Sequence, residues 1–215
     1  MKKNLLLISV ICFFNHTMLQ AQISGEKLIL GVSSSLNVVN TGSNIMSLGL
    51  SSTNYKSNAS GYTEPDPETS YSFNLLPKVG YMLTKNIALG INANIATYSY
   101  KRSYLGQKYN YKSSLINAGP FAKFYFDSNK VFPYLEAGGS YGLFKEKSTS
   151  TPEYKNGIFK IGGELGMAIS LGEKATFDTL FGYNSITVKD KENNPNNERV
   201  VIETFEVKLG FTIFL

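Results

Sequence analysis

The stretch VIETFEVKLGFTIFL, residues 201–215, alternates apolar with other side chains over almost its whole length. Every second position carries a large apolar residue, in the order Phe205, Val207, Leu209, Phe211, Ile213 and Leu215. The positions between them are small, polar or charged, apart from Phe214. A period of two predicts a β-strand, because successive side chains of a strand point to opposite faces. We expect one face of this strand to contact an apolar environment and the other a polar one.

The same alternation recurs along the chain in segments of roughly ten to fifteen residues separated by turns. Together with residues 200–215 there are eight such segments, at about 26–38, 70–83, 86–100, 113–126, 131–144, 157–171 and 175–188. No run of apolar residues is long enough for a transmembrane helix, and no convincing helical period appears. The pattern predicts an all-β chain.

The connections between these segments alternate in length. Short turns follow the second, fourth and sixth segments, whereas long polar connections are expected at about 40–69, 101–112, 146–157 and 188–199. Short turns at one end, long loops at the other and an even strand number are typical of an outer-membrane barrel. We therefore predict an eight-stranded antiparallel up-and-down transmembrane β-barrel. Pro77, Pro120 and Pro133 fit it least well, because proline interrupts a strand ladder.

The first residues have the layout of a secretory signal peptide. Two lysines precede an apolar run, and a small residue stands at Ala21. We expect residues 1–21 to be removed, leaving 22–215 as the barrel with both mature ends in the periplasm. A lipoprotein signal at Cys12 is a weaker alternative, because Ile11 before it is large.

Three stretches resemble a known family: NLLPKVGYMLTKNIALGI at 74–91, GPFAKFYF at 119–126 and FPYLEAGGSYG at 132–142. They are similar to the Gram-negative outer-membrane β-barrel domain proteins, the small porin-family and OmpA-like eight-stranded barrels. The resemblance implies the fold and the outer membrane, but no single activity. The alternating apolar row from Phe205 to Leu215 also resembles the signal read by the barrel-assembly machinery, although a final Leu replaces the more usual Phe.

The alternation predicts a balanced set of charges inside the barrel. The inward face carries Lys78, Lys123, Glu136, Lys160, Glu164, Asp178, Glu206 and Lys208. Because an eight-stranded barrel has an interior that side chains just fill, these charges are expected to pair. Lys123 and Glu136 flank one short turn and are expected to meet diagonally. The network is interpreted as a brace that plugs the lumen; a narrow ion path or polar ligand site is the alternative.

The residues available for catalysis are few. Cys12 and His16 are the only cysteine and histidine, and both lie in the expected signal peptide. A Ser–His mechanism and the usual zinc sites are thereby excluded for the mature chain. Glu64, Asp66 and Glu68 suggest at most a weak calcium site, with a solvated acidic turn as the simpler interpretation. We assign no catalytic, cofactor-binding or metal residues.

Two groups of residues could contact partners. The outer tyrosines, which are Tyr98, Tyr100, Tyr104, Tyr109 and Tyr111, are interpreted as a membrane-interface girdle, with a carbohydrate or protein site as the alternative. Ile45, Met46, Leu48 and Leu50 form an apolar patch in the first long loop, which either extends the barrel or contacts a partner.

The expected function is that of a non-enzymatic scaffold with surface loops, either free-standing or as an accessory subunit of a larger outer-membrane complex. A small porin or specific channel is the alternative. Expected partners are outer-membrane lipid and lipopolysaccharide, the barrel-assembly machinery and other outer-membrane proteins. The mild, scattered excess of 21 basic over 16 acidic residues does not favour nucleic acid.

Overall fold

The structure is a computed structural model that describes residues 26–36, 49–53, 68–104, 107–128, 130–149, 152–190 and 198–215. The expected signal peptide, residues 1–21, lies outside the described residues. Within the described part of the chain, no helix is long and apolar enough to cross a membrane.

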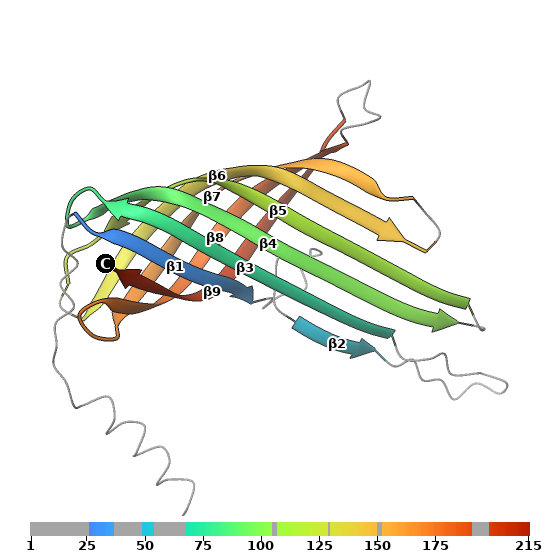
Figure 1. Cartoon of the computed structure of the whole chain (residues 1–215), viewed down its shortest axis with the longest axis horizontal. Helices are drawn as coiled ribbons and strands as arrows, with labels where there is room; N and C mark the ends of the chain where they lie inside the picture. Colours follow the sequence, from blue (N-terminus) through green and yellow to red (C-terminus); the bar gives the residue numbers. More distant parts are fainter. Residues whose placement is uncertain are drawn as a thin grey trace, which may run out of the picture.

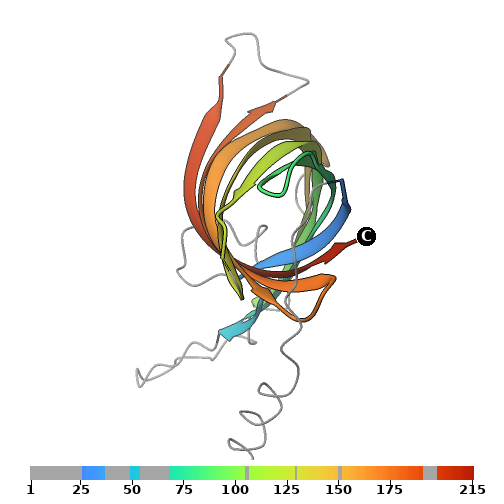
Figure 2. The same cartoon turned by 90° about the vertical axis from the view of Figure 1, so that its left-hand side faces the viewer.

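The described chain forms a closed antiparallel barrel (Figures 1 and 2). Its strands are β1 (Leu28–Leu36), β2 (Gly49–Thr53), β3 (Glu68–Met82), β4 (Ile87–Tyr104), β5 (Gln107–Tyr125), β6 (Val131–Ser148), β7 (Tyr154–Ser170), β8 (Ala175–Asp190) and β9 (Val200–Phe214). Each of β3 to β8 pairs with the next strand in the chain, and β1 pairs with both β9 and β3. Short β2 adds to the edge of β3 outside the ring of eight strands. The predicted eight-stranded barrel is confirmed.

The barrel closes where its first and last strands meet. Leu28 N donates to Leu215 O at 3.1 Å, and Leu215 N donates to Leu28 O at 2.9 Å. In this register Phe214 lies opposite Ile29 and points inward. The apolar residue that breaks the alternation of the last strand therefore packs inside the barrel.

The exterior is apolar around the ring. Large outward side chains are about half exposed, as at Ile91 (59%), Leu165 (61%) and Phe211 (53%). The inward row is rich in buried polar and charged residues. A continuous apolar surface of this kind is unfavourable in water and favourable in hydrocarbon. The closed ladder also pairs the backbone groups of every strand, which lipid could not hydrogen-bond. The barrel is thus built to span a membrane.

Several strands run past the ends that the alternation suggests. β4 reaches Tyr104 and β5 starts at Gln107, inside the connection expected at 101–112. β6 reaches Ser148 and β7 starts at Tyr154, inside the one expected at 146–157. The side chains there are polar or aromatic on both faces, so the alternation of apolar and polar residues is lost. The strands still pair, because backbone hydrogen bonds do not require an apolar face.

Two of the three prolines, Pro77 and Pro120, lie where ladders are interrupted. The β3–β4 register lacks a partner for Pro77, which instead lies opposite Val32 of β1. The β5–β6 register likewise omits Pro120, which lies opposite Ile91 of β4. A residue without an N–H can pair fully on one side only, so these prolines fit the barrel at local gaps.

Candidate functional site

The eight charged residues predicted to face the lumen all lie there in ion pairs. Their strands are β3, β5, β6, β7, β8 and β9, and alternation turns each side chain inward. The pairs are Lys78–Glu136 (2.6 Å), Lys123–Asp178 (3.5 Å), Lys160–Glu206 (3.5 Å), Lys208–Glu206 (3.2 Å) and Lys208–Glu164. We call these residues the lumen charge network.

The pairing differs from the expectation at one point. Lys123 and Glu136 lie directly opposite each other on β5 and β6, yet they take other partners. Lys123 Nζ lies 3.5 Å from Asp178 Oδ2, and Glu136 accepts two hydrogen bonds from Lys78. The curved wall brings distant strands within reach across the lumen, so adjacency along the ladder does not decide the partner.

Neutral groups complete the contacts of Asp178 and Lys123. Thr176 and Thr212 donate to the two oxygens of Asp178 at 2.8 and 2.6 Å. Lys123 Nζ lies 3.5 Å from the centre of the Tyr134 ring and 4.6 Å from that of Tyr125. Cation–π contacts and hydroxyl donors offset part of the cost of burying these charges.

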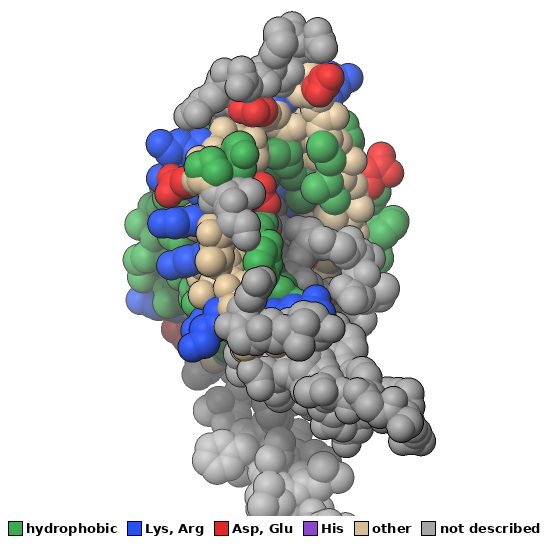
Figure 3. Space-filling view, turned by 90° about the vertical axis from the view of Figure 1, so that its right-hand side faces the viewer, with side chains coloured by type: hydrophobic (Ala, Val, Ile, Leu, Met, Phe, Trp, Pro, Cys, Tyr) green, Lys and Arg blue, Asp and Glu red, His purple; other side chains and the backbone are tan. Residues whose placement is uncertain are grey.

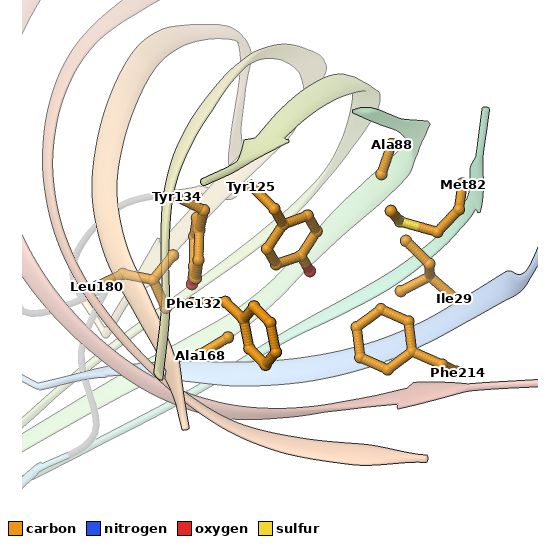
Figure 4. Packing of buried hydrophobic residues seen from close by; sticks show 9 residues of the cluster. All are labelled: Ile29, Met82, Ala88, Tyr125, Phe132, Tyr134, Ala168, Leu180 and Phe214. Atoms are coloured by element: carbon orange, nitrogen blue, oxygen red, sulfur yellow. The ribbon is translucent and has the colours of Figure 1, made fainter. Parts of the chain in front are cut away.

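An aromatic plug fills the lumen at the short-turn end (Figure 4). We use this name for the buried cluster Ile29, Met82, Ala88, Tyr125, Phe132, Tyr134, Ala168, Leu180 and Phe214. The rings of Tyr125 and Tyr134 lie 5.5 Å apart, and Phe214 approaches Tyr125 at 6.3 Å. The plug adjoins the lumen charge network, because the rings of Tyr125 and Tyr134 contact Lys123.

A small polar cavity adjoins the lumen charge network on its other side. Asn94, Asn117 and Asn184 line it together with Lys160 and Glu164, and the cavity has a volume of about 50 Å³. Asn117 Nδ2 and Asn184 Nδ2 are buried and have no hydrogen-bond partner among the described residues. Since one water needs roughly 10–15 Å³ of such space, the cavity can hold a few waters but no sizeable ligand.

A second apolar cluster lies beyond the cavity, toward the long-loop end. It contains Ala96, Leu115, Phe144, Ile158 and Ile186, with Val188 and Ile202 packed against it. These residues come from β4 to β9 and are set about two positions past the asparagines along their strands. Side chains thus occupy the lumen at three levels.

Four of the five outer tyrosines, Tyr98, Tyr100, Tyr109 and Tyr111, lie on the inner face of the extended wall and do not form an outward girdle, while the side chain of Tyr104 lies outside the described part. Tyr98 and Tyr111 pack edge to face at 6.0 Å, as do Tyr100 and Tyr109 at 6.3 Å. Tyr111 also donates to Glu146 on β6. The expectation of a girdle fails because β4 and β5 continue as paired strands and keep even β4 positions and odd β5 positions inside.

The remaining predicted residues are only partly described. Phe205, Val207, Leu209, Phe211, Ile213 and Leu215 all face outward on or just after β9. Ile45, Met46 and Leu48 lie outside the described residues, and the backbone of Leu50 lies in β2 opposite Tyr71. Glu64 and Asp66 also lie outside them, while Glu68 pairs with Arg102 at 3.0 Å.

Comparison with known proteins finds similar folds. No protein-family model matches the chain. No curated protein matches it either. Among solved structures, the chain is similar to the outer membrane protein OprG from Pseudomonas aeruginosa, with 14% identity, 89% of this chain and 97% of that one covered and a TM-score of 0.43. It is also similar to Neisserial surface protein A, with 17% identity, 88% and 97% covered and a TM-score of 0.41.

A third similar structure is the N-terminal β-barrel domain of Pseudomonas aeruginosa OprF. The identity is 10%, the match covers 89% of this chain and 99% of that domain, and the TM-score is 0.42.

Proposed function

We propose that the protein is an outer-membrane barrel of a Gram-negative bacterium that acts as a non-enzymatic scaffold with a lumen closed to solutes. The long-loop end faces outward and both mature ends lie in the periplasm. The filled lumen is the observation that carries this proposal: the aromatic plug, the lumen charge network and the second apolar cluster follow one another along the axis.

Conductance across a planar bilayer tests the closed lumen. The refolded mature barrel is expected to give a flat baseline. The positive control is a variant with Tyr134→Ala and Phe144→Ala, which removes one large side chain from the plug and one from the second apolar cluster. It is expected to conduct, which would show that the assay detects a narrow path. Steady current through the wild type would overturn the closed lumen.

A small channel is the second candidate, and the polar cavity favours it. Asn117 and Asn184 aim unpaired amide donors into a space next to the lumen charge network. Buried amide donors without a protein partner commonly donate to bound water, and a water-filled gap between charged groups could conduct small ions. Selective current abolished by Asn117→Leu would support this function in place of the scaffold.

The scaffold is proposed to be either free-standing or a subunit of a larger outer-membrane assembly, with its surface loops making the contacts. Gentle detergent extraction from the native membrane, followed by native sizing, separates the two. Co-migration with other proteins in a fixed ratio supports the subunit. Migration at the mass of one barrel supports the free-standing form.

The outward row of the last strand is proposed to be read by the barrel-assembly machinery. Phe205, Phe211 and Ile213 present large apolar side chains at 64%, 53% and 45% exposure. Replacing Phe211 by Ser should reduce insertion in cells while leaving refolding of the purified chain into vesicles nearly unchanged. Equal losses in both assays would point to stability and contradict recognition.

A further inference from the structure

The outer wall beyond the apolar exterior carries lysines that face one another across neighbouring strands. Lys112 of β5 lies directly opposite Lys147 of β6, and Lys145 of β6 lies directly opposite Lys155 of β7. All four side chains are exposed. They share the outward face with Leu143, which is two residues from Lys145. Figure 3 shows Lys and Arg side chains along one flank at the long-loop end.

This arrangement is unfavourable for the protein alone. Like charges directly opposite on adjacent strands destabilise a sheet, because their Cβ atoms lie only about 5 Å apart. Among the described residues, no carboxylate forms an ion pair with any of the four lysines. An anion bound between the opposed lysine side chains would attract both ammonium groups and so offset their mutual repulsion.

The depth of the lysines indicates which anion. Two residues of a strand span about 7 Å, so Lys145 lies just past the apolar residue Leu143 along the same face. That is the level at which hydrocarbon gives way to lipid headgroups. Phosphate is the anionic group expected there, and clusters of basic residues next to a membrane attract it.

A groove lies on the same outward face, and its lining residue Gly157 is two residues from Lys155 on β7. Tyr141 and Phe159 form its floor, at 58% and 46% exposure, while Lys189, Asp190 and Arg199 lie at its outer end. Lys189 is directly opposite Gly157, and both residues line the groove. The groove therefore joins an apolar surface suited to an acyl chain with a mainly basic end.

We propose that the outer face of β5 to β8 binds a phosphorylated lipid of the outer leaflet. Its phosphate groups lie against the opposed lysines, and an acyl chain runs along Tyr141 and Phe159. The inference rests on the proposed placement of the long-loop end in the outer leaflet, and it names the lipid contact of that surface.

Native mass spectrometry of the full mature barrel in a neutral detergent tests the proposal. The probe is a bisphosphorylated glucosamine lipid (lipid A), compared with the same lipid after removal of both phosphates. The test variant is Lys112→Gln with Lys147→Gln. The control is Lys130→Gln with Lys174→Gln, which removes the same charge from two exposed lysines at the short-turn end. A change in SDS gel mobility on heating, which folded barrels show, verifies that both variants are folded.

The wild type and the control should retain the phosphorylated lipid, and the test variant should retain it at least about tenfold less, since each basic residue near an anionic surface adds roughly fivefold. The proposal is overturned if the test variant binds like the wild type, if the control loses as much, or if the dephosphorylated lipid binds equally. Displacement by inorganic phosphate at matched ionic strength would also overturn it, by showing a site for free anions.

Thermal unfolding supplies a second readout whose sign reverses. In neutral detergent the test variant should melt above the wild type, because the repulsion is gone. With the phosphorylated lipid present it should melt below the wild type. Melting in the same order under both conditions contradicts the proposal. Neither readout depends on conductance. Failure of the lipid site therefore does not contradict the closed lumen, and a conducting lumen does not contradict the lipid site.

Discussion

Lys78 on β3 and Glu136 on β6 form an ion pair across the lumen, with the ammonium nitrogen 2.6 and 2.8 Å from the two carboxylate oxygens. Their strands are not neighbours in the sheet, so the contact ties opposite parts of the wall together. Glu136 is buried and Lys78 nearly so, with side-chain exposures of 6% and 9%. The pair braces the barrel in a way that no single strand ladder can.

Glu136→Gln should destabilise the barrel by about 3–5 kcal/mol, because it leaves the buried Lys78 with an uncompensated charge. The double variant Lys78→Met with Glu136→Leu should lose clearly less, since no lone charge remains. Reversible urea unfolding in lipid vesicles measures both. The matched control is Lys85→Met, which breaks an exposed pair with Asp127 and should change little. A Glu136→Gln variant as stable as that control contradicts the brace.

Leu165→Arg tests whether the exterior faces hydrocarbon. Leu165 points outward from the middle of β7 and is 61% exposed. In a membrane this substitution should cost about 2–4 kcal/mol, and Val201→Arg near the long-loop rim only about 0–1 kcal/mol. Urea unfolding in vesicles gives both values. Equal costs at the two depths would argue against a membrane-spanning exterior.

Gly119→Ala should interfere with the pairing of β5 and β6. An added Cβ would lie 2.0 Å from Gly139 O and 2.6 Å from Ser140 Cα, and both are backbone atoms that cannot move aside alone. We expect a loss of about 1–3 kcal/mol, as in other overpacked sites. Gly163→Ala is the control, because its Cβ would meet nothing nearer than 4.0 Å. Equal unfolding midpoints in urea would show that the wall adapts.

Tyr134 separates packing from hydrogen bonding in the aromatic plug. Its hydroxyl is buried without a hydrogen-bond partner among the described residues. Tyr134→Phe should therefore be neutral or slightly stabilising, because it removes an unsatisfied polar group. Tyr134→Ala should cost about 3–5 kcal/mol by leaving a cavity. Urea unfolding compares them; a large loss in the Phe variant would reveal a role for the hydroxyl.

Asp127 in the turn after β5 should titrate at lower pH than an ordinary aspartate. Lys85 Nζ donates to Asp127 Oδ2 at 2.9 Å and Asn86 Nδ2 to Oδ1 at 3.2 Å, and these bonds hold its pKa below the usual 3.8. The lowered pKa adds stability above pH 3.8, which is lost as the pH falls through the folded-state pKa. Lys85→Gln should raise the pKa toward 3.8, as followed by NMR of the carboxyl carbon. No change would contradict the hydrogen bond.

The alternation in the sequence predicts much of the barrel because it reflects a local property of strands. It locates eight strands, orients Leu165 outward and Asp178 inward, and turns the outward row of β9 to the exterior. It fails where both faces become polar or aromatic, so the true ends of β4 and β5 are missed. The tyrosines there are then assigned to the wrong face.

The sequence by itself determined the number of strands, the direction of their side chains and the balance of charge inside, because a period of two follows from the geometry of a single strand. The tertiary structure decided which charges meet. Lys123 reaches Asp178 and Glu136 reaches Lys78 because the closed, curved wall brings non-adjacent strands face to face. The opposed lysines on β5, β6 and β7 likewise depend on the register between strands, which the alternation along a single strand does not reveal.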